Sequence, residues 1–165
     1  MKLKLPFYSL YLFFTSVWWG WTVLVDMVVV RILFSRIDDI FVAGSIGMEL
    51  FSRLNQLEIV FSSALVVITV FSLREKKHHV FEFVFALFSW GISMIYFSYL
   101  TPKLITLTKL WKSSDLQGII SAPGIPDIQQ EHQFFHNLYI GLDSVKLVFL
   151  TLMIGAAFWR REKWE

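Results

Sequence analysis

The sequence predicts an all-α fold: a polytopic membrane four-helix bundle. Hydrophobic residues make up 56% of the 165 residues and charged residues only 17%, and the mean hydropathy is +0.59. The apolar residues are gathered in four long runs, and a helix needs about 20 such residues to cross a hydrocarbon core of about 30 Å. No internal repeat or low-complexity segment interrupts the chain, so we expect a single membrane domain over residues 1–165.

The first span is expected at about residues 5–34. Lys2 and Lys4 precede it, and inside it only Asp26 and Arg31 are charged. A signal peptide has a similar basic start, but its apolar core is shorter and ends at a small-residue cleavage site. We therefore predict that this run is an uncleaved membrane helix.

The second span is expected at about residues 54–73. Residues 35–53 before it mix charged and apolar side chains, which is typical of a short amphipathic segment that lies at the membrane surface. The uncharged core of the second run is too short to span. It reaches a spanning length only when Asn55 and Glu58 belong to its first turns.

The third and fourth spans are expected at about residues 80–100 and 134–159. The third ends at Thr101-Pro102, and residues 103–116 then show mixed helical periodicity, so we expect a partly helical outer loop. Asp127 with Gln130 three residues later is a helix-start signal. The fourth helix is therefore expected to begin outside the membrane and to enter it near His136.

The distribution of lysine and arginine predicts the orientation. One side of the predicted topology has the larger and denser set of positive residues, and it also holds both termini; this set is Lys2, Lys4, Arg74, Lys76, Lys77, Arg160, Arg161 and Lys163. The positive-inside rule then places both termini in the cytoplasm. We expect a multi-pass protein of a bacterial-type cell inner membrane.

This topology brings ionisable residues from different spans to one end of the bundle. In the last run, Asp143 and Lys146 lie one turn apart on one helical face, and His136 lies two turns earlier on that face. Charged groups at membrane depth are costly and face the bundle interior or a wet cavity. We therefore predict a buried polar cluster at the outer end, formed by Asp26, Arg31, Asn55, Glu58, His136, Asp143 and Lys146.

Three interpretations of this cluster remain open. It can be structural, with buried ion pairs such as Lys146 with Asp143 and Glu58 that fix helix packing. It can be a divalent transition-metal site formed by His132, His136 and Glu58, because imidazole and carboxylate suit zinc, copper(II) or iron. It can also be a proton or ion pathway through Asp26, Glu58, His136 and Asp143.

Other function classes find little support in the residues. The chain has no cysteine, which excludes disulfides, thiolate ligands and covalent haem attachment. Haem held by His132 or His136 is disfavoured, because both histidines lie on one helix and cannot ligate from facing helices. No nucleophile elbow or phosphate-binding glycine loop occurs, and the net charge of +2 is too small and scattered for nucleic acid.

Three stretches resemble the small four-span membrane family that includes human transmembrane protein 205 and bacterial proteins of unassigned function. The first is ILFSRIDDIFVAGSIGMELFSRLNQL at residues 32–57, the second is YLTPK at 99–103, and the third is 134–148 with Phe135-His136 and Asp143. Ser52 stands where that family usually has proline, and Asp143 where it usually has asparagine. The resemblance implies a four-helix bundle, an association with trafficking and drug tolerance for the human relative, and no established reaction.

Taken together, the sequence predicts a non-enzymatic membrane protein that lies in the lipid bilayer as an accessory or partner-binding subunit. Its partner would be another membrane protein or a second copy of the chain. The alternative is metal-ion or proton handling through Asp26, Glu58, His132, His136 and Asp143. No cofactor is firmly implied, although a divalent transition metal would suit the histidines.

Overall fold

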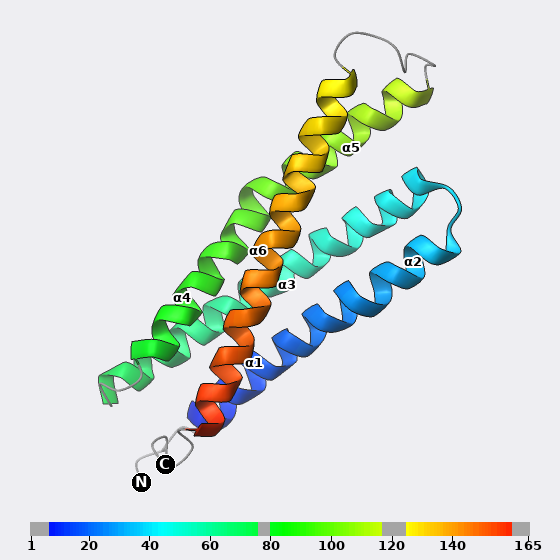
Figure 1. Ribbon diagram of the computed structural model, residues 1–165. Coiled ribbons are helices and arrows are strands. Elements are labelled where there is room, and N and C mark those ends of the chain that lie inside the picture. The colour runs from blue at the N-terminus through cyan, green and yellow to red at the C-terminus, as the bar shows by residue number, and fades with distance from the viewer. Residues whose placement is uncertain (1–6, 76–79, 117–124, 160–165) are drawn as a thin grey trace.

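The protein forms a bundle of four long rods in the computed structural model, which describes residues 7–75, 80–116 and 125–159 (Figure 1). The first rod comprises α1 (Phe7–Val23), the π-helical turn η1 (Leu24–Val29) and α2 (Val30–Arg36). The second is α3 (Ile40–Glu75), the third comprises α4 (Val80–Ile95), η3 (Tyr96–Leu100) and α5 (Thr101–Leu116), and the fourth is α6 (Ile125–Trp159). Each rod is long and apolar enough to cross a membrane. The predicted all-α, four-span class is confirmed.

Most of the short amphipathic segment expected at the membrane surface before the second span forms the first part of α3. Asp39 caps this helix, because its carboxylate accepts hydrogen bonds from the backbone N–H of Phe41 at 2.8 Å and of Val42 at 3.2 Å. No proline lies between this cap and residue 54, so nothing in the backbone ends the helix there. The amphipathic stretch and the span are one element.

The segment that follows Pro102 is likewise continuous with the third span. Proline lacks a backbone N–H and cannot donate to the carbonyl four residues earlier, which normally breaks or kinks a helix. Here η3 comes immediately before Thr101-Pro102, and the wider turn lets the chain pass the proline without ending. The chain bends between α4 and α5 but stays helical (Figure 1).

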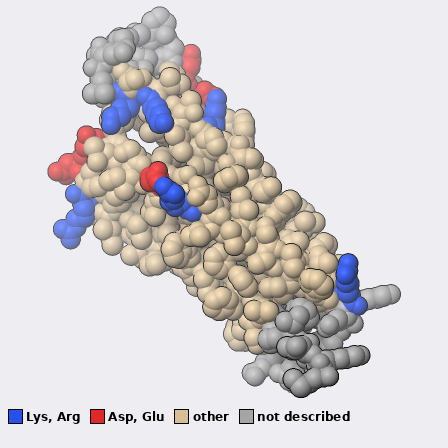
Figure 2. All heavy atoms as spheres, turned by 180° about the vertical axis from the view of Figure 1, so that it is seen from behind, with Lys and Arg blue, Asp and Glu red and all other residues tan. Residues whose placement is uncertain are grey.

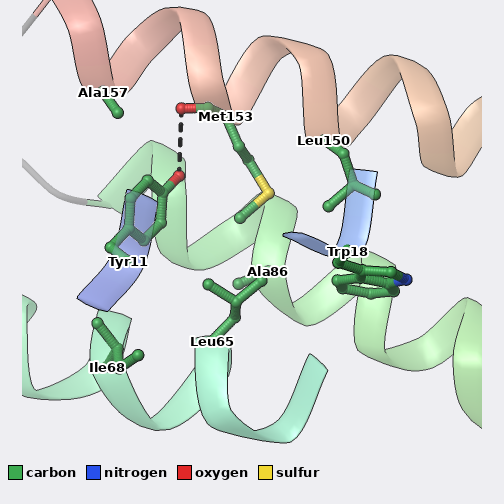
Figure 3. Packing of buried hydrophobic residues seen from close by; sticks show 8 residues of the cluster. All are labelled: Tyr11, Trp18, Leu65, Ile68, Ala86, Leu150, Met153 and Ala157. Atoms are coloured by element: carbon green, nitrogen blue, oxygen red, sulfur yellow. Dashed lines mark hydrogen bonds between the residues drawn. The ribbon is translucent and has the colours of Figure 1, made fainter. Parts of the chain in front are cut away.

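The start of α1 and the end of α6 lie at the same end of the bundle, here called the near end (Figure 1). An apolar core close to this end joins all four rods: Tyr11 and Trp18 of α1, Leu65 and Ile68 of α3, Ala86 of α4, and Leu150, Met153 and Ala157 of α6 (Figure 3). The Tyr11 hydroxyl donates to the backbone carbonyl of Met153 at 3.4 Å. A second core of Ile92, Tyr96, Leu100, Leu104 and Tyr139 lies toward the opposite, far end.

Several buried threonine hydroxyl groups inside the spans are satisfied by their own helices. Thr15, Thr22 and Thr69 are buried, and each donates to the carbonyl four residues earlier, at 2.7, 3.0 and 2.9 Å. Such bonds allow polar residues inside a membrane helix, where an unsatisfied group would cost several kcal/mol. These hydroxyls therefore need no partner from another span.

Charged residues gather toward the ends of the face seen in Figure 2, and uncharged residues cover the surface between them. Large apolar side chains are exposed along the rods, among them Phe88, Phe97 and Val60. On a soluble protein such exposure would mark an interaction surface. On a spanning bundle it is the surface that meets lipid, so the bilayer environment follows from the fold.

Candidate functional site

Lys146 lies at the centre of a buried charge cluster in the far half of the bundle. It is fully buried, and its Nζ donates to Glu58 Oε1 at 2.5 Å. It also forms an ion pair with Asp143, one turn earlier on α6. The ammonium also lies over the ring of Tyr96 in η3, 5.1 Å from its centroid, which is close enough for a cation–π interaction. Lys146 thus links α6 to both α3 and η3.

Asp26 brings the first rod to the same cluster. It lies in η1, and its carboxyl is in hydrogen-bonding contact with that of Asp143. The cluster therefore contains three carboxyl groups, from Asp26, Glu58 and Asp143, and a single ammonium, which pairs with Glu58 and Asp143. Two carboxylates in contact at low dielectric repel each other strongly unless they share a proton or a cation lies beside them. The cluster has more acid than base.

A layer of polar aromatic and amide side chains covers the cluster on its far-end side. The Tyr139 hydroxyl donates to Asn55 Oδ1 at 3.1 Å, and Asn55 Nδ2 donates to Thr101 Oγ1 at 2.6 Å. The Tyr96 hydroxyl donates to the backbone carbonyl of Tyr139 at 3.2 Å, and the two tyrosine rings stack with centroids 4.4 Å apart. These bonds connect α3, η3, α5 and α6.

Tyr96, Thr101 and Tyr139 are site residues that the sequence analysis missed. A signal for Tyr139 existed, since it lies four residues before Asp143 and therefore on the same helical face. Tyr96 and Thr101 gave no such signal, because their positions depend on the π turn and on which face of the third rod looks inward.

A cavity of about 470 Å³ adjoins the cluster between the first rod, the start of α3, α5 and α6. Asp26, Asp143 and His136 lie in its wall together with Thr101, Tyr139 and Ser144, and the rest of the lining is apolar or glycine: Met27, Val30, Phe34, Gly44, Gly47, Met48, Phe51, Leu104, Ile140 and Leu147. Its volume falls within the range of about 300–1,000 Å³ that is common for small-molecule sites.

The proposed metal ligands are not brought together. His132 Nε2 lies 3.2 Å from Thr108 Oγ1, and its ring stacks on that of His136 with centroids 6.1 Å apart. Glu58 instead pairs with Lys146, which lies 14 residues beyond His132 on α6, or about 21 Å along a helix. Among residues 7–75, 80–116 and 125–159, no group of three His, Asp or Glu side chains is placed to hold a metal ion.

Arg31 does not belong to the buried cluster, contrary to the sequence-based prediction, because its side chain is exposed. His136 is half-buried and borders the cavity, whereas Asn55, Glu58, Asp143 and Lys146 are buried.

Comparison with known proteins identifies a family but no activity. The profile of a domain of unknown function (DUF4149) matches residues 13–112. This match covers most of the first three rods and includes Asp26, Asn55, Glu58 and Tyr96. No curated protein and no solved structure is significantly similar to the chain.

Proposed function

Because the chain belongs to the family defined by the domain of unknown function DUF4149, we propose that it is a non-enzymatic accessory subunit of the membrane. In this role it binds another membrane protein or a second copy of itself through its lipid-facing helices. We place it in a bacterial-type inner membrane with both termini in the cytoplasm. We also infer kinship with the four-span family of human transmembrane protein 205, on the three sequence stretches described above.

The observation that carries this proposal is the internal pairing of the buried charges. Lys146 is engaged by Glu58 and Asp143, and Asn55 by Tyr139 and Thr101. Membrane spans gain little from the hydrophobic effect when they associate, so polar pairs of this kind determine which helices pack together. The cluster then stabilises the packing of the bundle, and the lipid-facing surfaces of the helices are available for contacts with other membrane proteins.

The outer faces are rich in aromatic side chains that suit such contacts. Aromatic residues make up 18% of the chain, and Phe13, Trp21, Phe88 and Phe97 are all exposed on the first and third rods. Rings of this size supply large contact areas between proteins.

The proposal is tested by extracting the protein from its native membrane together with the surrounding lipid, using a styrene–maleic acid copolymer. Native mass spectrometry should then find the chain in a complex of fixed stoichiometry, with a different membrane protein or with itself. Phe88→Ala combined with Phe97→Ala should reduce the yield of the complex and leave the chain folded. Ser45→Ala, at an exposed position of α3, is the matched control. A chain that emerges as a lone protomer would contradict the accessory role.

A second candidate, proton or cation handling, is favoured by the excess of carboxyl groups over ammonium. Asp26 and Asp143 are in contact and both lie in the cavity wall, so one site carries negative charge and borders an open space. Liposomes that contain the purified protein and a trapped pH dye would show proton flux that Asp26→Asn abolishes. Equal flux in protein-containing and empty liposomes would remove this candidate.

A further inference from the structure

The wall of the cavity beside the charge cluster combines two acidic side chains with mostly apolar residues. Asp26 and Asp143 form the acidic end with their contacting carboxyl groups. The opposite walls consist of side chains such as Val30, Phe34 and Phe51, which offer no hydrogen bond. An apolar pocket with a few convergent polar groups is the usual form of a small-molecule site.

The charges in and behind the wall determine which ligand the acidic end would accept. Asp26, Glu58 and Asp143 contribute three negative charges when all are ionised, and Lys146 contributes one positive charge. Even if Asp26 and Asp143 share a proton, one negative charge remains in excess. A cation beside Asp26 would neutralise it, whereas an anion would be repelled.

We propose that this cavity binds an amphipathic cation, a molecule with a single ammonium group and an apolar body. The ammonium would lie against the Asp26 and Asp143 carboxyl groups, and the apolar body would lie along the walls formed by α2, α3 and α6. A neutral lipid chain would fill the apolar part but leave the excess charge unpaired. A bare metal ion would lack a third ligand among the described residues and would leave the apolar walls unused.

Two glycines of α3 open the space that the body of this ligand would occupy. Gly44 and Gly47 both line the cavity. A Cβ atom added at Gly44 would meet no atom within 4 Å, and one at Gly47 would meet Leu33 Cδ2 at 3.6 Å. A side chain at Gly44 would therefore begin without a clash at its Cβ atom, and we expect a larger side chain at this lining position to occupy the cavity. Helix propensity would favour that substitution as well.

The test uses three probes that share one apolar body: octylammonium, octanol and octanoate. Binding of radiolabelled octylammonium to the full-length protein in lipid nanodiscs is measured at equilibrium, and binding to empty nanodiscs is subtracted. We expect saturable binding of one molecule per chain. Octanol should compete about tenfold less well or worse, since it lacks the charge-assisted bond, and octanoate should not compete.

Gly44→Leu should abolish binding, because it fills the cavity and leaves the charge cluster untouched. Gly155→Leu is the matched control: it lies on α6 outside the cavity lining, a Cβ there also meets nothing within 4 Å, and binding should persist. Asp26→Asn should weaken binding about tenfold. Circular dichroism checks that each variant folds, and Gly44→Ala, a smaller change at the same site, should give a partial loss.

Three results would overturn the proposal: equal competition by octanol and octylammonium, full binding by the folded Gly44→Leu variant, or no saturable binding at all. The proposal does not depend on the accessory role or on proton flux. A chain that forms no complex with other proteins could still bind octylammonium, and the reverse outcome would leave the accessory role intact.

Discussion

Lys146 shows how a single side chain can decide the packing of a membrane bundle. It is fully buried between helices, with Glu58 on one side and Asp143 on the other. An ammonium in hydrocarbon without a counterion is among the least favourable arrangements in a protein. The position of α6 relative to α3 is therefore specified at this point, because any other register would leave the lysine without its partners.

We predict that Lys146→Met destabilises the bundle by about 3–5 kcal/mol, since it leaves buried carboxylates without their cation. The free energy of unfolding is measured by titration with SDS in mixed micelles. Lys103→Met is the matched control: its ion pair with Glu131 is 2.7 Å long but partly exposed, and such pairs contribute about 0–1 kcal/mol.

The double variant Lys146→Met, Glu58→Gln extends this measurement. Each single variant leaves the other member of the pair buried with an unpaired charge, whereas the double variant removes both charges. The double variant should therefore lose less unfolding free energy than the sum of the two single losses. Strict additivity of the two losses would show that the 2.5 Å contact does not couple the helices.

Tyr139 offers a second test at the level of one hydroxyl group. Tyr139→Phe removes the donor to Asn55 Oδ1 but keeps the ring that stacks on Tyr96. We expect a loss of about 0.6–1.7 kcal/mol in unfolding free energy, the range for hydrogen bonds between membrane helices. Tyr99→Phe, at a residue that is 55% exposed, should change stability by less than about 0.5 kcal/mol.

Individual site residues were predictable from the sequence only where charge made them rare. Asp26, Glu58, Asp143 and Lys146 stand out in an apolar chain, and inward orientation follows from the cost of exposing them to lipid. Tyr96 and Tyr139 do not stand out, since a tyrosine on a membrane helix is equally suited to the lipid interface. The pairing of His132 with Thr108 could not be predicted either, because it requires the position of α5 over α6.

At the level of elements, the two π turns among the described residues place cluster side chains that a regular helix would aim elsewhere. η1 contains Asp26, and η3 contains Tyr96. A π turn inserts an extra residue into the helical repeat and rotates everything that follows relative to an unbroken helix. Such turns leave no signature in hydrophobic periodicity, so the sequence predicted the spans without indicating their orientation near the site.

We predict that Pro102→Ala shifts the third rod toward a regular helix. Alanine restores the backbone N–H, so the carbonyl of Ser98 regains a partner four residues later, and the π turn loses its cause. Spin labels at Val84 and Lys109, on either side of η3, would report a longer distance in the variant by double electron–electron resonance. Substitution of exposed Thr106 by alanine controls for a general change in α5, and an unchanged distance in the Pro102→Ala variant would refute the explanation.

Pro102→Ala should also disturb the contact between Tyr96 and Lys146 in the charge cluster. If the third rod straightens, the Tyr96 ring moves relative to Lys146, which now lies 5.1 Å from its centroid. The sequence analysis ended the third span at Thr101-Pro102 and expected a short amphipathic surface segment over residues 35–53, whereas α3 begins at Ile40 and the third rod continues past Pro102. Composition changes at both places, yet the backbone hydrogen bonding continues through them.

At the scale of the whole molecule, the fold class followed from composition and run length, because only helices with satisfied backbones can cross lipid. The cavity did not follow from the sequence. It exists where the first rod diverges from α6 and where Gly44 and Gly47 leave space on α3, and this depends on angles between helices. Sequence spacing gives the depth of a residue in the membrane far better than the shape of the space around it.

The arrangement of the rods makes a final prediction about orientation, which the absence of cysteine makes easy to test. Single cysteines at exposed Asp38 and Gln129 lie at the far end, and those at exposed Arg74 and Trp159 lie at the near end. With the termini in the cytoplasm, a membrane-impermeant maleimide added to intact spheroplasts should label the first pair and not the second. Permeabilised cells should show labelling at all four positions, which controls for reactivity. The opposite pattern would invert the topology and place the buried cluster nearer the cytoplasm. A mixed pattern at one end would contradict the bundle itself, since α3 and α6 both end at the near end.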